Sequence, residues 1–214
     1  AGQRHPFVVA WQHYIDVPGL KSAASFNCPR LMAKRFCPAC ARVDSLRATG
    51  NPVDYDLAGE VRANKRVYAS VINRAAPERG PVVWGFGKQI HERLIALAQN
   101  PDWGDYTDPG PDGYDIAVLR TGLDKKTKYD LQGARTCTPL SNDAAEASEW
   151  LNMSRDLGQF TLVPSDEEIA RMLPGWSSGP PAAATRGAQA GPPGGRRRRA
   201  ADDVVDADDF DEVT

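Results

Sequence analysis

Three of the four cysteines in this 214-residue chain lie close together, at Cys28, Cys37 and Cys40. A disulfide framework, a redox centre and a metal site are the chemistries open to them. Four cysteines in a chain of this length, with no signal peptide visible, argue against a disulfide framework. A redox Cys-x-x-Cys lies between a strand and a helix of a βαβ unit, and the preceding "RLMAKRF" does not provide that context. The spacing therefore favours a metal, with Cys37 and Cys40 converging from one turn and Cys28 supplying a third thiolate.

A closed structural zinc site needs four ligands, and His13 and Cys137 compete for the fourth position. His13 lies in "AWQHYI", whose alternation predicts a strand that can turn and return to Cys28. Cys137 lies far along the chain from Cys40, where the role of a small buried apolar residue is more common. We therefore predict one structural zinc ion, held by His13, Cys28, Cys37 and Cys40. The other histidines, His5 and His91, are expected to be ordinary surface or packing residues.

Longer motifs extend this pattern. The four predicted ligands follow His-x14-Cys-x8-Cys-x2-Cys, with Pro38 between the last two cysteines. Downstream, "VYASVI" precedes "RAAPERGPVVWGFGKQIHERLIAL", and "YDIAVLRTGLDKKTKYD" follows. Together these motifs, over about residues 6 to 135, resemble the phage single-stranded DNA-binding proteins of the T-even helix-destabilising family. The first barrel strand of that family normally precedes the "PF" run and is absent here, so we expect further chain upstream of Ala1.

The resemblance implies a fold and a function. The expected fold is mainly β with helices: an OB-fold barrel with an inserted zinc-binding subdomain, a helical extension and a disordered acidic C-terminal tail. The expected function is sequence-tolerant binding and protection of single-stranded DNA during phage replication, recombination and repair, in the cytoplasm of the host cell. The expected partners are single-stranded DNA, replication and recombination proteins recruited by residues 202–214, and further copies of the chain bound cooperatively on DNA. No membrane is expected as a partner.

Composition and periodicity divide the chain into parts. We expect an OB-fold core over 1–140 with a zinc-binding insertion at about 16–62, a helical extension over 141–174, a flexible Gly/Pro/Ala/Arg linker over 175–201, and the acidic tail over 202–214. Alternation predicts core strands at 7–15, 67–73, 82–86, 114–120 and 128–137, and helical spacing predicts a helix over 88–100. Ser165 and Glu168 form a predicted capping box that opens a short helix.

Charge is split between the body of the chain and its tail. Seven acidic and no basic residues lie in 202–214, so the rest of the chain carries 26 basic against 21 acidic residues. A mildly basic body suits a polyanionic partner, and the alternative is a solvated surface with a solubility tail. Acidic tails with a few apolar residues can recruit proteins, or can mimic nucleic acid and occupy the basic groove of their own chain.

A groove for single strands combines basic residues with aromatic faces on which bases stack. By the resemblance, Tyr68 and Trp84 match positions where aromatic residues line the DNA cleft. Alternation puts Trp84 and Phe86 on one face, so the two share a role, either in stacking or in the core. The basic hairpin "TGLDKKT" is alternatively a solvated turn. The predicted DNA contacts are Arg66, Tyr68, Trp84, Phe86, Lys88, Arg120, Lys125, Lys126, Lys128 and Tyr129.

An enzyme is not expected from this sequence. It contains no GxGxxG, no P-loop and no nucleophile elbow. The zinc-deaminase signature H-x-E also fails, because His13 is followed by Tyr14 and Ile15. The alternative function is a zinc-ribbon-like transcription or replication factor that acts mainly through protein contacts.

Overall fold

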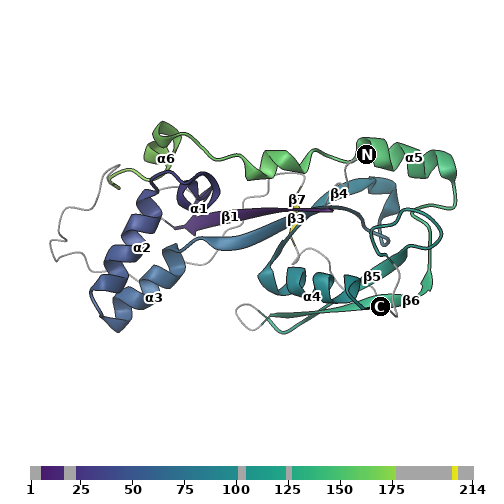
Figure 1. Cartoon of the computed structure of the whole chain (residues 1–214), viewed down its shortest axis with the longest axis horizontal. Coiled ribbons are helices and arrows are strands. Elements are labelled where there is room, and N and C mark those ends of the chain that lie inside the picture. The colour runs from purple at the N-terminus through teal and green to yellow at the C-terminus, as the bar shows by residue number, and fades with distance from the viewer. Residues whose placement is uncertain (1–5, 17–22, 101–104, 124–126, 177–203, 207–214) are drawn as a thin grey trace. The chain divides into compact units, whose positions relative to one another are not determined.

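The computed structural model describes residues 6–16, 23–100, 105–123, 127–176 and 204–206 (Figure 1). The chain forms two compact units. The first, which we call the metal unit, consists of Ala10–Lys65 and Thr161–Ala200. The second, which we call the strand unit, consists of Ala1–Val9, Arg66–Phe160 and Ala201–Thr214. The predicted zinc-binding insertion therefore lies entirely in the metal unit.

The metal unit combines a strand pair with short helices. Strand β1 (Phe7–Ile15) pairs antiparallel with β2 (Ala24–Asn27), and the register places His13 opposite Phe26. Each of the three following helices has a proline in its first turn, where the missing N–H would lack a helical partner anyway. These helices are α1 (Pro29–Ala33), α2 (Pro38–Ala48) and α3 (Pro52–Val61). The sequence predicted β1 with these bounds, but it did not predict β2, α1 or α2.

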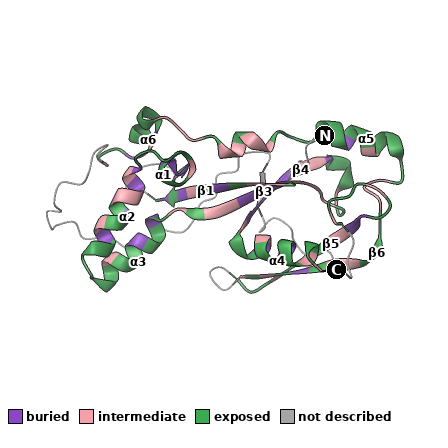
Figure 2. Ribbon diagram, in the orientation of Figure 1, coloured by how far each residue is buried: buried purple, intermediate pink, exposed green. Residues whose placement is uncertain are grey.

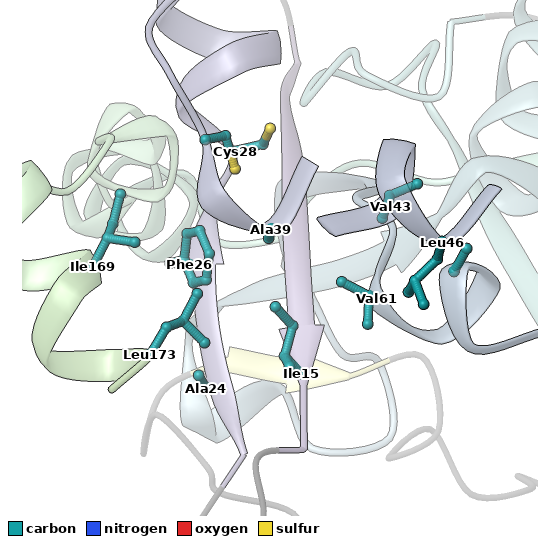
Figure 3. Packing of buried hydrophobic residues seen from close by; sticks show 12 residues of the cluster. Ile15, Ala24, Phe26, Cys28, Ala39, Val43, Leu46, Val61, Ile169 and Leu173 are labelled. Atoms are coloured by element: carbon teal, nitrogen blue, oxygen red, sulfur yellow. The ribbon is translucent and has the colours of Figure 1, made fainter. Parts of the chain in front are cut away.

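The metal unit has its own apolar core (Figure 3). Val43 and Leu46 of α2 pack with Val61 of α3 and with residues of β1 and β2. Helix α6 (Asp166–Met172) joins the same cluster through Ile169, and Leu173 follows directly after the helix. Figure 3 shows both of these side chains beside β2. The core of this unit is therefore completed by a segment that lies far from the other core residues in sequence.

Polar contacts fix α6 within the metal unit. Ser165 caps the helix, and its hydroxyl accepts from the Glu168 N–H while the Glu168 carboxylate accepts from the Ser165 N–H, so the predicted capping box is confirmed. Before the helix, the Asn27 side-chain amide donates to the Leu162 carbonyl at 2.7 Å, and Arg35 donates to the Pro164 carbonyl. The same unit therefore holds both the apolar face and the start of α6.

The strand unit contains two antiparallel strand pairs. Strand β3 (Asn64–Ile72) pairs with β4 (Pro81–Gly87) after the short 3-10 turn η1 (Pro77–Arg79), and β5 (Tyr114–Thr121) pairs with β6 (Lys128–Cys137). Helix α4 (Lys88–Ala98) follows β4, and α5 (Ala144–Met153) and η3 (Leu157–Thr161) follow β6. The predicted strands and helices of this region are confirmed, with shifts at their ends.

One face of the β3–β4 pair forms the core of the strand unit. Val67 and Ala69 of β3 pack with Trp84 and Phe86 of β4 and with Ile90 of α4. Figure 2 shows buried stretches in β3 and β4, flanked by residues of intermediate exposure. Because successive residues of a strand point to opposite faces, Tyr68 and Gly85 belong to the other face of the pair.

A short strand of the acidic tail also belongs to the strand unit. Strand β7 (Val204–Asp206) runs parallel to β4, with Val205 in register with Trp84 and Asp206 in register with Gly85. The rest of the tail and nearly all of the linker, including Arg196–Arg199, lie outside the described residues. The boundary between the units at Phe160 also divides the predicted helical extension, which was expected to be one part.

The fold is mixed α/β with antiparallel strand pairs. Closure into an OB-fold barrel stays a prediction. Among the described residues, no helix combines the length and the apolar character that crossing a bilayer requires.

We expect Leu173→Ala to destabilise the metal unit, because Leu173 is 1% exposed within its core. Truncating a buried leucine costs about 2–5 kcal/mol, depending on how far the cavity collapses. Thermal unfolding followed by circular dichroism measures the change. The control is Arg171→Ala, because Arg171 is exposed on the same helix, and its unfolding should match the wild type. An unchanged midpoint for Leu173→Ala would show that α6 does not belong to this core.

Candidate metal centre

The local backbone brings three cysteines to helix starts. Cys28 directly follows β2 and is the N-cap of α1, and its N–H donates to the Trp11 carbonyl of β1 at 2.6 Å. Cys37 is the N-cap of α2, and Cys40 lies in the first turn of that helix. Helix starts favour thiolates, because unpaired backbone N–H groups and the helix dipole stabilise negative charge there. His13 comes from the neighbouring strand β1.

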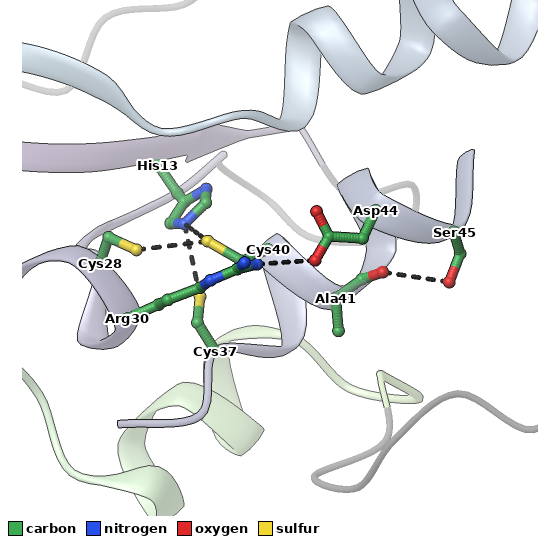
Figure 4. A network of polar contacts seen from close by, with 8 residues as sticks. All are labelled: His13, Cys28, Arg30, Cys37, Cys40, Ala41, Asp44 and Ser45. Atoms are coloured by element: carbon green, nitrogen blue, oxygen red, sulfur yellow. Dashed lines mark hydrogen bonds and ion pairs between the residues drawn. The ribbon is translucent and has the colours of Figure 1, made fainter. Parts of the chain in front are cut away.

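The four donor atoms meet at one point (Figure 4). All lie within 4.8 Å of one another. The His13 Nε2 atom is 3.4 Å from the Cys37 sulfur and 3.6 Å from the Cys40 sulfur, and the Cys28 and Cys40 sulfurs are 3.4 Å apart. A tetrahedral zinc with usual bond lengths would separate two sulfurs by about 3.8 Å and a sulfur from a nitrogen by about 3.5 Å. The observed spacing therefore fits a single tetrahedral metal ion.

The candidate centre is largely buried. His13 and Cys28 are fully buried, Cys37 is nearly so, and Cys40 is half-buried. Three thiolates and one imidazole fill a tetrahedral coordination shell and leave no position for a substrate or a water molecule. This arrangement suits a structural metal rather than a catalytic one.

Contacts around the ligands orient them. The Val61 carbonyl can only accept, so the Nδ1 atom of His13, 2.8 Å away, carries the proton and Nε2 is left to bind a metal. The Phe26 ring packs against the imidazole, with ring centroids 5.2 Å apart. Arg30 forms an ion pair with Asp44 at 2.6 Å, and the negative charge of the nearby cysteines adds to the raised pKa of its guanidinium. Outer contacts of this kind hold a metal ligand in one rotamer and one tautomer.

Crowding at the candidate centre shifts the pKa values of His13, Cys28 and Cys40 in conflicting directions. Burial lowers the pKa of His13, but hydrogen bonds with Cys28, Cys37 and the Val61 carbonyl outweigh burial and raise it to about 9. Hydrogen bonds with Cys37 and Cys40 lower the pKa of Cys28, whereas the contacts of Cys40 with Cys28 and Cys37 raise the pKa of Cys40. A metal that binds these groups would displace protons from them, because thiolate and neutral imidazole are the binding forms.

The predicted ligand set is the one that comes together. Among the described residues, the one group of side chains placed closely enough to share a metal ion consists of His13, Cys28, Cys37 and Cys40. Cys137, the alternative fourth ligand, is exposed at the end of β6 in the strand unit.

The two aromatic residues predicted on β4 lie in the core. Trp84 is 6% exposed, Phe86 is fully buried, and their ring centroids are 4.4 Å apart. The sequence correctly predicted that they share a face. That face packs against α4 and β6, so the core alternative describes their position and neither ring presents a surface to a base.

The basic residues predicted to contact DNA have different surroundings. Lys88 is exposed and pairs with Glu92 one helical turn along α4 at 3.4 Å, and Lys128 is exposed at the start of β6. Arg120 lies opposite Tyr129 in the β5–β6 pair; both are half-buried, and Tyr129 packs against the core of the strand unit. The remaining two, Lys125 and Lys126, lie outside the described residues.

Tyr68 and Arg66 lie on the face of β3 that is turned away from this core. The Tyr68 ring stacks on Phe160 of η3, with centroids 4.7 Å apart and ring planes 21° apart. Sequence reasoning missed Phe160, because "GQFTLVP" has no strand or helix periodicity that would assign its ring to a face.

No protein-family model matches the chain, and no curated protein sequence matches it.

We expect the purified chain to carry one metal ion, and Cys37→Ser to lose it. Metal binding is part of the folding free energy of such a unit, so the melting temperature should fall by on the order of 10 °C. Elemental analysis and thermal unfolding measure both effects. Cys137→Ser is the matched control and should keep the metal and the wild-type stability. A Cys37→Ser protein with full metal content would exclude this site.

Proposed function

We propose that the chain binds single-stranded DNA without strong sequence preference, and that a structural zinc ion organises its metal unit. The observation that carries the proposal is the convergence of His13, Cys28, Cys37 and Cys40 at tetrahedral spacing. That ligand motif was the centre of the resemblance to phage single-stranded DNA-binding proteins. Three thiolates with one imidazole are also the donor set that zinc prefers in structural sites.

A second observation supports the proposal. Arg66 and Tyr68 are neighbours on one face of β3, which places a guanidinium beside an aromatic ring. A nucleotide offers the complementary pair, a phosphate and a base face. The mildly basic body of the chain suits the same polyanionic ligand. By this proposal, DNA binding involves no chemical step and the chain is not an enzyme.

The acidic tail would regulate binding and recruit replication and recombination proteins. Its strand β7 lies along β4, and Asp206 is in register with Gly85, the residue opposite Tyr68. An acidic segment in this place would compete with the phosphates of a bound strand. The tail would then become available to partner proteins when DNA displaces it.

One observation favours the alternative of a zinc-ribbon-like factor that acts through protein contacts. Val53 and Tyr55 of α3 are 72% and 62% exposed, and apolar side chains of this size are common in protein interfaces. The two functions predict different results with an isolated oligonucleotide, because only the first requires direct binding to it.

We expect oligo-dT to bind more tightly than a duplex of equal length, with an affinity that falls steeply as salt is added. Arg66→Ala should reduce the slope of log K against log salt by about 0.7, the value for one phosphate contact on a single strand. Tyr68→Leu should weaken binding by about 1–3 kcal/mol and leave the slope nearly unchanged. Fluorescence anisotropy measures both quantities. Arg79→Ala, an exposed arginine of η1, is the charge-matched control and should bind like the wild type. Preference for the duplex, or no salt dependence, would contradict the proposal.

We expect deletion of Asp202–Thr214 to tighten DNA binding, most strongly at low salt, where the tail and the basic body attract each other best. Val205→Pro separates strand pairing from charge, because proline disrupts β7 and leaves all seven acidic residues in place. It should give part of the same gain. Affinities equal to wild type for both proteins, at low and at high salt, would reduce the tail to a solubility element.

A further inference from the structure

Gly85 makes room for two side chains on the face of β4 that is turned away from the core. It lies directly opposite Tyr68 in the β3–β4 pair. A Cβ atom at this position would come within 3.1 Å of the Tyr68 ring and 3.2 Å of the Arg66 guanidinium. Both side chains therefore lie across β4, and only glycine lets them approach the strand so closely. The result is an aromatic ring and a positive charge side by side.

A segment from much later in the chain covers this ring. Phe160, the fourth residue of η3, stacks on Tyr68 almost in parallel, at the 4.7 Å and 21° given above. A nucleic acid base on an aromatic side chain adopts the same kind of stack. Tyr68 is only 6% exposed, although it lies on the face opposite the core. Its face is therefore already occupied.

We propose that Phe160 takes the place of a base in the nucleic-acid-free protein. When single-stranded nucleic acid binds, an unpaired base stacks on Tyr68, its phosphate pairs with Arg66, and the strap Leu157–Thr161 moves away. This inference rests on the proposed function, because it concerns how the same surface accepts its ligand. It adds a residue, Phe160, and a step, the exchange of one ring for another.

Contacts at the two ends of the strap do not involve the ring of Phe160. None of its residues is buried. On its N-terminal side, Asp156 accepts from the Gly158 N–H in a local turn at 2.9 Å. On its C-terminal side, the Leu162 carbonyl accepts from Asn27 and the chain enters α6. The ring of Phe160 can therefore leave Tyr68 while both ends of the strap keep their contacts.

Magnitudes favour the exchange. Stacking of two aromatic side chains changes the equilibrium constant for forming their contact by about 2- to 12-fold. Stacking of a base on an aromatic side chain changes the binding constant by about 5- to 160-fold. A free base therefore displaces Phe160, but at reduced affinity. A base in a duplex must first be unstacked and unpaired, which costs additional free energy. The covered ring therefore lowers the affinity for paired DNA further below the affinity for a single strand.

The experiment measures oligo-dT binding by Phe160→Leu, Tyr68→Leu and the double variant. Phe160→Leu should bind about 2- to 12-fold more tightly than the wild type, because no ring competes with the base. In the Tyr68→Leu background the same substitution should give no gain, because the two rings act on each other. Phe7→Leu is the matched control: Phe7 is a half-buried ring packed on Phe86 and His91, and its loss should give no gain in affinity.

A measurement on the wild-type chain tests the movement itself. Amide hydrogen exchange at Leu157–Thr161 should become faster when oligo-dT is bound, and thermal unfolding checks that each variant is folded. Wild-type binding with unchanged or weaker binding by Phe160→Leu, or with slower exchange in the strap, would overturn this inference and leave the proposed function standing. Absence of oligo-dT binding by the wild type would overturn both.

Discussion

The structure of the metal unit depends on the convergence of three sulfurs and one imidazole at a buried point. Hydrogen bonds among the thiols lower the pKa of Cys28 and raise the pKa of Cys40, while burial raises both, so the four groups do not favour one common charge state. A divalent cation would satisfy all four groups at once, by replacing protons with bonds to the four donors. The β1–β2 pairing and the starts of α1 and α2 are the local consequences, since each of them places one or two ligands.

The candidate metal centre is not the only feature that organises the metal unit. Helix α6 arrives from more than a hundred residues downstream of the cysteines and fills the core with Ile169, followed by Leu173. Two kinds of contact therefore hold the metal unit together. One is the group of candidate metal ligands, which are close in sequence, and the other is the apolar core, which includes residues distant in sequence. Because the strap lies directly before α6, its C-terminal end is held by the folding of the metal unit, whereas Phe160 packs in the strand unit.

Ligand spacing and strand alternation could be predicted because both are local. Cys37 and Cys40 lie one helical turn apart wherever the helix is placed, and β1 and β6 were predicted with their observed bounds. Alternation also predicted that Trp84 and Phe86 share a face, but it could not tell which face is buried, because α4 and β6 decide that from elsewhere in the chain. The role of Phe160 and the packing of the predicted helix α6 into the core of the metal unit were missed for the same reason. Both segments contact residues that are distant in sequence, and no pattern in either segment identifies those residues.

The two faces of the β3–β4 pair have different roles. Val67, Trp84 and Phe86 build the core on one face, so a change there alters stability and any function that depends on the fold. Arg66 and Tyr68 lie on the other face, outside the cluster that forms this core. Gly85 connects the two faces. Because it has no side chain, Tyr68 and Arg66 can lie close to β4 on the outer face, while its neighbours Trp84 and Phe86 pack in the core on the inner face. A larger residue in place of Gly85 would push the Tyr68 ring and the Arg66 guanidinium away from β4 while the core on the other face stayed packed. A substitution of Gly85 therefore tests the role of the outer face separately from folding.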